Sequence, residues 1–525
     1  MITHCLHLEP AWEQLDLNDL DDISAFNIHV THLTTEACYE DTWHSFPHHM
    51  GNLRSLYETQ KRIAQLSGLY PEYSDCCVGI CCCFTGKYET LDCCPFPDCW
   101  EPHYNMSRKP QFHFQSLPVG PQLQAMFWNK DTVDLLCYCF NHTSNPNCSK
   151  ISDVFDGSLY QELCQQYVCT EDNTYSHKYF ENPCDIAFGL SLDGFPIFST
   201  TNQSAWPIIL INFNLPPNIH IHLVHILCYG IIPAPRAVKD MDSFLFPLYH
   251  ELVKLTARIS TLDLNEKECF LLCVFLILIF GDMPAISKIM RMKGHNGICP
   301  CWFCEICGVR HLMGKVYYVP LWCAEVSNHY NVKALPMQTH QHFLKQAGEV
   351  VLTATNAEED RLLTKYGIKG ILLLSLLSSL SFPFSFPLNF MHLIFENLIP
   401  NLIGHYTGTF KDLDCRSEDY KLPADVWSAI CQAGAASGKT IPSLFRPQVS
   451  NIEREQSSMM ANAWSFWSQY ISPVLLRNHF QNCHYYKHFI DLIHLIKLCL
   501  NYDMEPTDIE EIWHGFTKWV TEYEE

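Results

Sequence analysis

The chain has 525 residues, of which 48% are hydrophobic and 13% aromatic, so it can form several globular domains and is not a disordered protein. Its formal net charge of −22 argues against a DNA-packaging role, because affinity for a phosphate backbone depends on lysine and arginine. This charge is compatible with a local basic patch for DNA, or with a site that gathers carboxylates around divalent metal.

We expect an intracellular protein, because the N-terminus lacks a basic segment followed by an apolar one. In that compartment its 28 cysteines are expected to be metal ligands or small buried residues and not disulfides. The apolar run from Cys269 to Phe280 is shorter than the roughly twenty residues of a spanning helix, so it suits a buried strand. The run 370–387 is broken by serines and by Pro383 and Pro387, so we expect no membrane span there either.

A cysteine-rich segment follows a first stretch, residues 1–70, that looks helical and partly acidic. Eight cysteines lie between Cys76 and Cys99, which chance burial rarely produces. Two close cysteine groups on either side of a turn at Thr85 and Gly86 are typical of a zinc ribbon, in which four thiolates hold one tetrahedral ion. A redox-inert or decayed cluster is the alternative. The zinc ligands that we expect are Cys77, Cys81, Cys94 and Cys99.

The most regular part of the chain begins at Asp185. DIAFGLSLDGFPIF predicts one strand that ends at Asp193 and Gly194 and a second that starts at Phe195. WPIILINFNLP and HLVHILCYGIIP predict two more strands, and DSFLFPLYHELVKLTARI predicts an amphipathic helix. ECFLLCVFLILIFGD then predicts a buried central strand with Asp282 at its end. The pattern as a whole indicates a mixed α/β fold.

Asp193 and Asp282 each follow a buried strand, where a charge is costly unless it is paired or bound to metal. The alternative is that each aspartate merely begins a turn. Two strand-end aspartates plus a carboxylate on a later helix can hold two divalent ions about 4 Å apart for displacement at phosphorus. Mg²⁺ (or Mn²⁺) suits such a site, because it needs few carboxylates and leaves room for phosphate and water.

The third polar position lies in LNFMHLIFEN, near the end of a long apolar run. In a buried helix Asn389, His392 and Glu396 stand at i, i+3 and i+7, so they share one stripe. That stripe needs something to face, which makes Glu396 and Asn389 candidates for the third metal ligand. The alternative for Asn389 is capping of the helix N-terminus after Pro387.

A second cysteine group follows Asp282, after a short basic stretch. The basic residues Lys288, Arg291 and Lys293 are candidates for DNA contact. The following C-x2-C pairs have the spacing of a zinc knuckle. Its expected ligands are Cys301, Cys304, Cys307 and His311.

From about Leu33 onward the chain resembles transposases of the CACTA (En/Spm) class, especially fungal copies. The resemblance rests on strings in a fixed order: CCVGICCCFTG, DIAFGLSLDGF, WPIILINFNLPP, VKDMDSFLFPL, FGDMPAISKIMRMKGHNGICPCWFCEI and FPLNFMHLIFENLIPNLI. It implies an RNase H-like core interrupted by zinc-binding insertions, and metal-dependent nicking and transfer of DNA strands at transposon ends. The implied layout is a helical lead-in (1–70), a zinc-ribbon-like module (71–110), a connector (111–180), a first core part (181–298), a zinc-knuckle-like insertion (299–369), a final core helix (370–411) and a helical region (412–525).

By the same resemblance, Asp193 matches the first catalytic aspartate and Asp282 the second. Asp240 and Asp242 also fall in a shared string, but they begin a helix, so a role at its N-terminus is the simpler expectation. At the third position related sequences carry Asp-x-Met-His where this chain has Asn389 and His392. An amide lacks the charge that a carboxylate gives Mg²⁺, so Glu396 is the alternative third ligand.

Two further departures concern the first cysteine module: C-x2-C becomes C-x4-C, and EPRY becomes EPHY with His103 in place of arginine. The main hypothesis is therefore an active or degenerate transposase that acts in the nucleus on terminal repeats, with self-association as a further expectation. The main alternative is a non-catalytic, zinc-dependent DNA-binding or scaffold protein that descends from a transposon. A cysteine-rich metallohydrolase unrelated to DNA is a third alternative, and it would need an open three-ligand zinc site.

Overall fold

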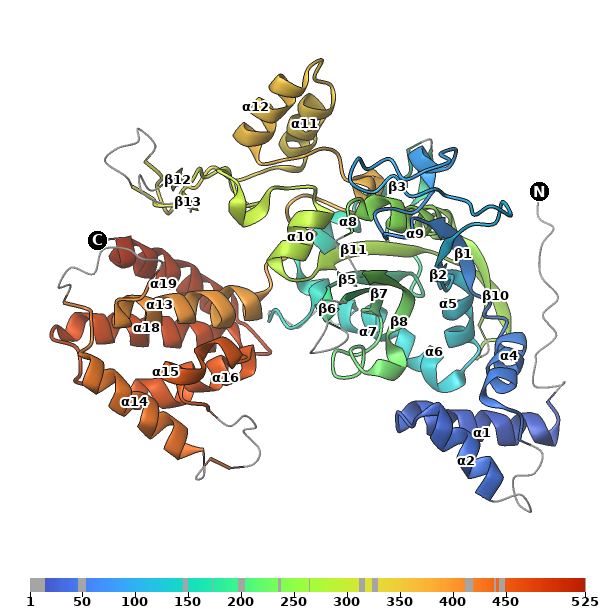
Figure 1. Ribbon diagram of the computed structural model, residues 1–525, viewed down its shortest axis with the longest axis horizontal. Helices are drawn as coiled ribbons and strands as arrows, with labels where there is room; N and C mark the ends of the chain where they lie inside the picture. Colours follow the sequence, from blue (N-terminus) through green and yellow to red (C-terminus); the bar gives the residue numbers. More distant parts are fainter. Residues whose placement is uncertain are drawn as a thin grey trace. The chain divides into compact units, whose positions relative to one another are not determined.

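The computed structural model describes twelve stretches of the chain, which form two compact units. The first unit is Met1–Asn141 with Gln166–Leu276, and the second is His142–Gln165 with Ile277–Glu525. Figure 1 shows their helices and strands in the colours of the sequence. The described residues are 15–45, 53–144, 150–171, 173–196, 204–234, 238–263, 265–310, 317–322, 329–410, 419–438, 441–442 and 449–524.

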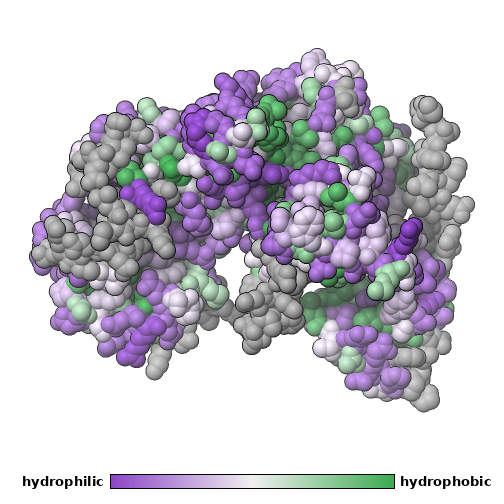
Figure 2. Space-filling view, turned by 45° about the horizontal axis from the view of Figure 1, so that its top comes forward, coloured by the Kyte–Doolittle hydropathy of each residue, from purple (hydrophilic) through white to green (hydrophobic). Residues whose placement is uncertain are grey.

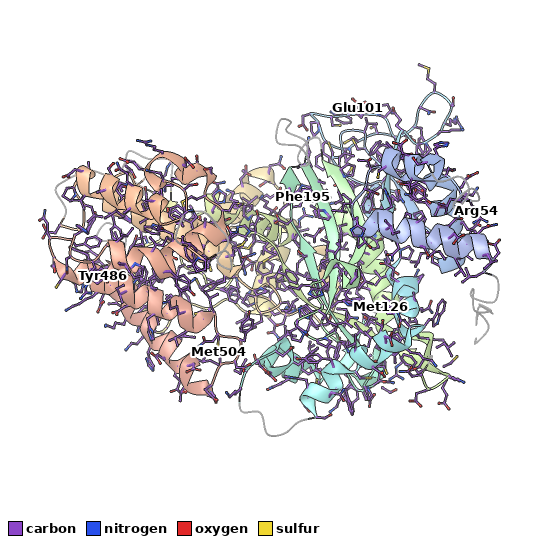
Figure 3. The ribbon with its side chains drawn as sticks, turned by 90° about the horizontal axis from the view of Figure 1, so that it is seen from below. Arg54, Glu101, Met126, Phe195, Tyr486 and Met504 are labelled. Atoms are coloured by element: carbon purple, nitrogen blue, oxygen red, sulfur yellow. The ribbon has the colours of Figure 1, made fainter. Side chains whose placement is uncertain are left out.

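Among the described residues, three helices open the first unit: α1 (Leu17–Thr31), α2 (Glu36–Ser45) and α4 (Leu56–Ser67). The described part of the segment 1–70 is therefore mainly helical. A buried ion-pair network joins α1 to the start of α4, where Arg54 is labelled in Figure 3. Asp19 is fully buried, and it receives two hydrogen bonds from Arg62 (2.8 and 2.6 Å) and one from Arg54 (2.9 Å).

The central sheet contains seven strands within the described residues. Its order is β1-β2-β8-β7-β5-β11, and β6 pairs with β7. Apolar β-branched and aromatic residues supply its buried positions, which is why these segments form strands. The strands are β1 (Glu72–Cys76), β2 (Phe112–Ser116), β5 (Ile186–Leu192), β6 (Phe195–Pro196), β7 (Ser204–Asn212), β8 (Leu227–Ala234) and β11 (Val274–Phe280).

The first four strands and the helix expected after Asp185 are confirmed. β5 pairs antiparallel with β7, and β7 pairs antiparallel with β8, with a register shift between Ile208 and Ile209. Helix α9 (Met241–Thr256) then connects this meander to the later strands, and its apolar face is buried. Pro247 lies inside α9, in its second turn, where its missing N–H removes one backbone hydrogen bond of the helix.

The apolar run before Asp282 differs from the expected single central strand. It forms two strands: β10 (Glu268–Leu272) pairs with β9 (Ile259–Asp263) in a separate sheet, and β11 is the last strand in the order of the main sheet. The division falls at Cys273, whose backbone N–H donates to Asp185 Oδ1 (3.2 Å) and whose carbonyl accepts from Ile186 (2.9 Å). A uniformly apolar run carries no signal for this break.

β5 and β11 run in the same direction. They are neighbours in the sheet, and the start of β5 is hydrogen-bonded to Cys273, the residue just before β11. Antiparallel pairing from that point would carry β11 away from β5, so both strands must extend from the bonded start. Each strand is followed closely by one of the two aspartates, Asp193 and Asp282.

The remaining short helices and two small strands lie in the first unit, except that the segment 142–165 belongs to the second unit. None of the described helices is long and apolar enough to cross a membrane. The elements are η2 (Gly86–Tyr88), α5 (Val119–Phe127), α6 (Lys130–Leu136), α7 (Tyr138–Thr143), η3 (Val154–Asp156), α8 (Ser158–Leu163), β3 (Tyr167–Cys169), β4 (Thr174–Lys178) and η4 (Leu223–His225).

The described residues of the second unit are mostly helical, including those of its C-terminal part. Trp464, Trp467 and Trp519 belong to one apolar cluster with residues of the segment 394–406. On the face drawn in Figure 2 the described surface is largely hydrophilic, with hydrophobic residues in separate areas. The elements are α10 (Met283–Ile289), η5 (Gly294–Asn296), β12 (Val309–Arg310), β13 (Tyr317–Tyr318), α11 (His340–Val351), α12 (Asn356–Tyr366), η6 (Leu373–Leu376), η7 (Met391–Leu398), α13 (Ile399–Thr407), α14 (Ala424–Ser437), α15 (Ile452–Glu455), η8 (Gln456–Ser458), α16 (Ala461–Phe466), η9 (Trp467–Ile471), α17 (Ser472–Leu475), α18 (Cys483–Cys499) and α19 (Pro506–Glu524).

The helix that contains His392 and Glu396 is not the buried α-helix that the sequence predicts. Residues Met391–Leu398 form a π-helix, so the hydrogen bonds run from i to i+5 and the spacing per turn is wider than in an α-helix. Ile394 and Phe395 face the apolar cluster, whereas Glu396 is exposed. The polar residues of this helix are therefore compatible with solvent and need no buried partner.

Candidate functional site

The four cysteines expected to form the first zinc site come together. The sulfur atoms of Cys77, Cys81, Cys94 and Cys99 all lie within 4.8 Å of one another, and Cys77 and Cys99 are 3.5 Å apart. Zn–S bonds of about 2.3 Å place tetrahedral sulfurs about 3.8 Å apart, so this group fits a structural zinc ion. The C-x4-C spacing from Cys94 to Cys99 therefore does not prevent the four thiols from converging.

The backbone beside these thiols is shaped around them. The N–H of Gly79 donates a hydrogen bond to Cys77 Sγ at 3.3 Å. A Cβ atom on Gly79 would lie only 3.2 Å from Cys99 Sγ, so a side chain there would crowd the cluster. Glycine at this position lets the turn pass close to the sulfurs.

The pKa values of Cys77 and Cys99 are shifted in opposite directions. Burial raises the pKa of Cys77 to about 12, with hydrogen bonds to Cys99 and Cys94 as further causes. Burial also opposes ionisation of Cys99, but the backbone N–H of Glu101 and the thiols of Cys77 and Cys81 outweigh it and lower its pKa. Four thiolates this close repel one another, and a divalent cation removes that cost, so the donor set favours metal.

The cysteine cluster is fixed to the start of helix α9 in the same unit. The carbonyl of Cys81 accepts hydrogen bonds from the backbone N–H groups of Lys239 (3.1 Å) and Asp240 (3.0 Å). Asp240 is buried, and its carboxylate bonds Tyr88 Oη and Lys87 Nζ, each at 2.8 Å. The expectation of a role at the helix N-terminus is correct in position, but the side chain of Asp240 holds the cysteine-rich segment and does not cap the helix.

His103, which replaces the arginine of related sequences, is a structural residue of this segment. Its ring stacks between Phe84 (3.8 Å) and Tyr104 (3.9 Å). Nδ1 faces the carbonyl of Leu91 (2.9 Å) and Nε2 faces the carboxylate of Asp75 (3.0 Å). Each ring nitrogen therefore faces an oxygen acceptor.

Within the described residues the second cysteine group lies in two pairs, and the expected zinc knuckle stays a prediction. Cys307 Sγ lies 3.0 Å from Cys299 Sγ, and a hydrogen bond to Cys304 is the main cause that lowers the pKa of Cys301 to about 6. In the described ranges these cysteines do not join in a group of three ligand atoms close enough for one ion. His311 lies outside the described residues.

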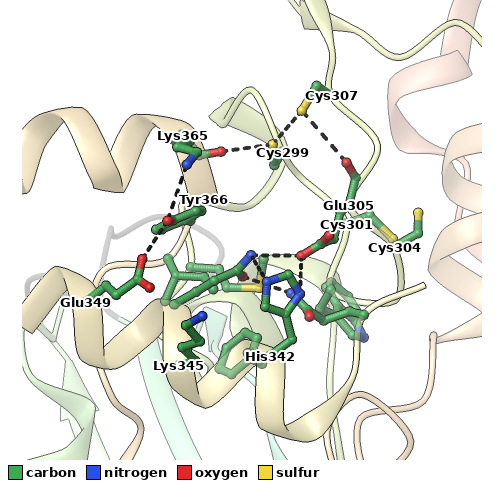
Figure 4. Close-up of a pocket in the computed structure, with 16 residues that line it drawn as sticks. Cys299, Cys301, Cys304, Glu305, Cys307, His342, Lys345, Glu349, Lys365 and Tyr366 are labelled. Atoms are coloured by element: carbon green, nitrogen blue, oxygen red, sulfur yellow. Dashed lines mark hydrogen bonds and ion pairs between the residues drawn. The ribbon is translucent and has the colours of Figure 1, made fainter. Parts of the chain in front are cut away.

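These two cysteine pairs line a cavity of about 370 Å³ in the second unit, shown in Figure 4. His342 from α11 points to Glu305, with 2.9 Å between Nδ1 and Oε1. Tyr366 donates a hydrogen bond to Glu349 at 2.6 Å, and Cys299 Sγ donates to the carbonyl of Lys365 at 3.2 Å. The polar groups named here thus already form hydrogen bonds or ion pairs within the protein.

Asp193 follows β5 on an exposed turn of the first unit. The next residue, Gly194, packs on the indole of Trp206 from β7, and a Cβ there would lie 2.6 Å from the ring. Glycine is required at this point because the backbone contacts an aromatic face. The position of the Asp193 carboxylate is therefore tied to the packing of Gly194 on Trp206.

Asp282, in the second unit, is the N-cap of α10. Its carboxylate accepts a hydrogen bond from the backbone N–H of Ala285, and Met283 and Pro284 begin the helix, a favourable start. Asp282 thus begins a helical turn, as the alternative expectation for it states. The capping bond uses Oδ1, so Oδ2 is the oxygen for a further partner.

The two candidates for the third ligand differ in their contacts. Asn389 Oδ1 accepts the backbone N–H of His392 at 3.3 Å, which is the capping interaction expected for an asparagine at this position. Glu396 bonds to Nδ1 of His392 and is 36% exposed. The carboxylate of Glu396 is thus held by a neighbouring imidazole on the same helix.

The basic residues after Asp282 lie close to one another in the second unit. Lys288 is on α10, Arg291 has a positive φ of 53°, and Lys293 Nζ donates to Thr364 Oγ1 at 3.5 Å. Burial lowers the pKa of Lys288. The charge of Asp282 raises this pKa, whereas the charge of Lys369 lowers it further. Sequence reasoning missed Lys369, because no local pattern links it to residues that precede it by more than seventy positions.

One comparison with known proteins gives a family. Residues 166–321 match the family model described as Transposase family tnp2. This stretch includes β5, β7, β8, α9 and β11, together with both strand-end aspartates, and it is similar to that transposase family. No curated protein sequence matches the chain.

Proposed function

We propose that the chain is a transposase-like protein that nicks and transfers DNA strands at transposon ends, with Asp193 and Asp282 as catalytic metal ligands. The observation that carries the proposal is the shared direction of β5 and β11, each of which is followed by one of these aspartates. Strands that run in the same direction end at the same edge of a sheet. The match to the transposase family, which includes both residues, supports this function.

The order of the strands supports an RNase H-like core. An antiparallel meander (β5, β7, β8) is followed by helix α9, and then by a strand beside the first that runs in its direction. A three-stranded meander, a crossover helix and a fourth strand parallel to the first are the arrangement that this fold requires. The division of the core by insertions stays a proposal.

Mg²⁺ or Mn²⁺, when bound, would lower the pKa of the attacking water or hydroxyl and stabilise the leaving oxygen. The carboxylates of Asp193 and Asp282 would hold the ions, and the third ligand would be Glu396 or the amide oxygen of Asn389. Each of these side chains already makes a hydrogen bond: Asn389 accepts from the backbone of its helix, and Glu396 bonds to His392. The cluster of Cys77, Cys81, Cys94 and Cys99 could hold a structural zinc ion, and we assign it no part in the chemistry.

The direct test is a nicking assay with zinc-loaded protein on supercoiled plasmid that carries candidate terminal repeats, with and without Mg²⁺ or Mn²⁺. We expect metal-dependent nicks that disappear in Asp193→Ala and in Asp282→Ala. The matched control is Asp263→Ala, an aspartate at the end of β9 outside the main sheet. Nicking that survives in Asp193→Ala would refute the catalytic assignment.

A second candidate function, a zinc-dependent DNA-binding or scaffold protein without catalysis, has its own supporting observation. The four-thiol cluster is complete, whereas Asn389 stands where related sequences carry aspartate and serves as a helix cap. This candidate predicts zinc and salt-dependent DNA binding, no nicking, and no Mn²⁺ binding that depends on Asp282. A nuclear location and self-association are proposals that accompany either function.

A further inference from the structure

Two distant segments of the second unit form a small antiparallel bridge. Lys293 N–H donates to the carbonyl of Gly367 at 2.7 Å, and Lys369 N–H donates to the carbonyl of Arg291 at 2.6 Å. Between these bonds Met292 pairs with Ile368, and both of these residues are buried (3% and 1% exposed). The two segments are therefore held in a fixed register.

This register brings cations together. Residues next to the paired positions of an antiparallel bridge face one another across it, so Arg291 lies opposite Lys369. Lys293, on the other side of buried Met292, is close enough for its charge to act on Lys369. Lys369 is exposed, and Arg291 and Lys293 are half-buried.

Like charges directly across a bridge destabilise it. Burial lowers the pKa of Lys369, and the charges of Lys293 and Arg291 lower it further. Throughout the described stretches no carboxylate lies within 4.0 Å of the ammonium groups of Lys293 or Lys369. A chain with 56 acidic and 34 basic residues thus gathers cations here at a cost, which an external anion would offset.

We propose that Lys369 joins Arg291 and Lys293 in a binding site for the phosphate backbone of duplex DNA. The proposal rests on the proposed function and deepens it, because it names the surface after α10 that would hold the DNA. A duplex presents phosphates at regular intervals, so several fixed cations can bind it at once. A single free phosphate would engage the same cations without that repetition.

The test measures fluorescence anisotropy of a labelled DNA duplex of mixed sequence, over a series of salt concentrations, with the zinc-loaded full chain. The slope of log K against log salt is negative, and each lost phosphate contact reduces its magnitude by about 0.9. We therefore expect a shallower slope for Lys369→Gln by that amount and the wild-type slope for Lys369→Arg. Lys487→Gln, an exposed lysine on α18, is the control and should change nothing. Melting curves of all variants establish that the fold is kept.

Several outcomes would overturn the proposal: an unchanged slope in Lys369→Gln, an equal decrease in Lys487→Gln, or no binding of duplex DNA by the wild type. Competition by inorganic phosphate at equal phosphate concentration, as strong as that of unlabelled duplex, would identify a small-anion site and also overturn it. So would tighter binding of duplex RNA than of DNA. Because binding is measured without nicking, a failure of catalysis leaves the result for Lys369 unaffected, and the converse also holds.

Discussion

The backbone N–H of Ile186 donates a hydrogen bond to the carbonyl of Cys273 at 2.9 Å. This bond joins the starts of two neighbouring strands, β5 and β11, and gives them a common direction. The buried side chain of Asp185 strengthens the junction, because its carboxylate accepts the backbone N–H of Cys273 at 3.2 Å. Burial raises the pKa of Asp185 to about 6, so this junction contains an acid that is partly neutral near that pH.

The first prediction concerns zinc. Cys94→Ser should lose the zinc of the first cysteine module, because serine oxygen is a poor substitute for thiolate in a four-sulfur site. Elemental analysis after dialysis measures this as a loss of about one equivalent of zinc per chain. Cys431→Ser, a buried cysteine on α14, is the control and should retain all zinc. Equal zinc contents in Cys94→Ser and wild type would contradict the assignment.

Gly79→Ala tests the shape of the same site without removing a ligand. The new methyl group would lie 3.2 Å from Cys99 Sγ, so we expect weaker zinc binding, measured by competition with a chromogenic chelator. Gly348→Ala on α11 has open space around the new methyl group and should leave zinc affinity unchanged. Wild-type affinity in Gly79→Ala would show that the turn is less closely fitted than the distances indicate.

A third prediction concerns the anchor of the cysteine-rich segment. Asp240→Asn removes the ion pair with Lys87 and weakens the hydrogen bond from Tyr88, at a cost of about 1–3 kcal/mol for a charged hydrogen bond in a buried site. Thermal unfolding should begin at a lower temperature. The rate of amide hydrogen exchange should rise in residues 81–88, and the zinc content should stay the same. Asp242→Asn in the first turn of α9 is the matched change. Exchange that rises equally in both variants would argue against a specific role of Asp240.

Asp19 gives a pH prediction with a definite sign. The hydrogen bond from Arg62 holds the pKa of Asp19 below its ordinary value of 3.8, despite burial. The stability that this ion pair contributes is therefore present above pH 3.8 and is lost as the pH falls through the lower, folded-state pKa. Asp19→Asn should speed hydrogen exchange in α1 and α4 at neutral pH, and the difference from wild type should shrink in strong acid. A difference that grows with acidity would have the wrong sign.

Asn389→Asp and Glu396→Gln separate the two candidates for the third ligand. Aspartate caps helices as well as asparagine does, so Asn389→Asp should fold normally. If position 389 is the third ligand, the added charge should increase Mn²⁺-dependent nicking, and Glu396→Gln should have little effect. Loss of nicking in Glu396→Gln with no gain in Asn389→Asp would instead assign the role to Glu396.

Strong local patterns predicted much of this molecule, and long-range pairing limited the rest. The strand ends at Asp193 and Asp282 and the convergence of Cys77, Cys81, Cys94 and Cys99 could be predicted, because period-two apolar runs and dense cysteines leave few alternatives. Whether the aspartates share a metal site stays a prediction.

Other features could not be predicted because they depend on contacts between distant segments. The break at Cys273 depends on Asp185. The grouping of Arg291, Lys293 and Lys369 depends on the pairing of Met292 with Ile368. The π-helix at Met391–Leu398 was also missed, since an apolar pattern with spaced polar residues does not distinguish i+4 from i+5 hydrogen bonds. The pairing of Cys307 with Cys299 could not be predicted, because several cysteines lie close together in that part of the sequence.

The most direct measurement is a double-mutant cycle for Mn²⁺ binding by titration calorimetry, with zinc-loaded wild type, Asp193→Asn, Asp282→Asn and the double variant. Two carboxylates that share metal ions are coupled, so we expect each single variant to lose most of the Mn²⁺ affinity and the double variant to lose little more. Losses that simply add, or Mn²⁺ binding unchanged in either single variant, would show that Asp193 and Asp282 do not form one site.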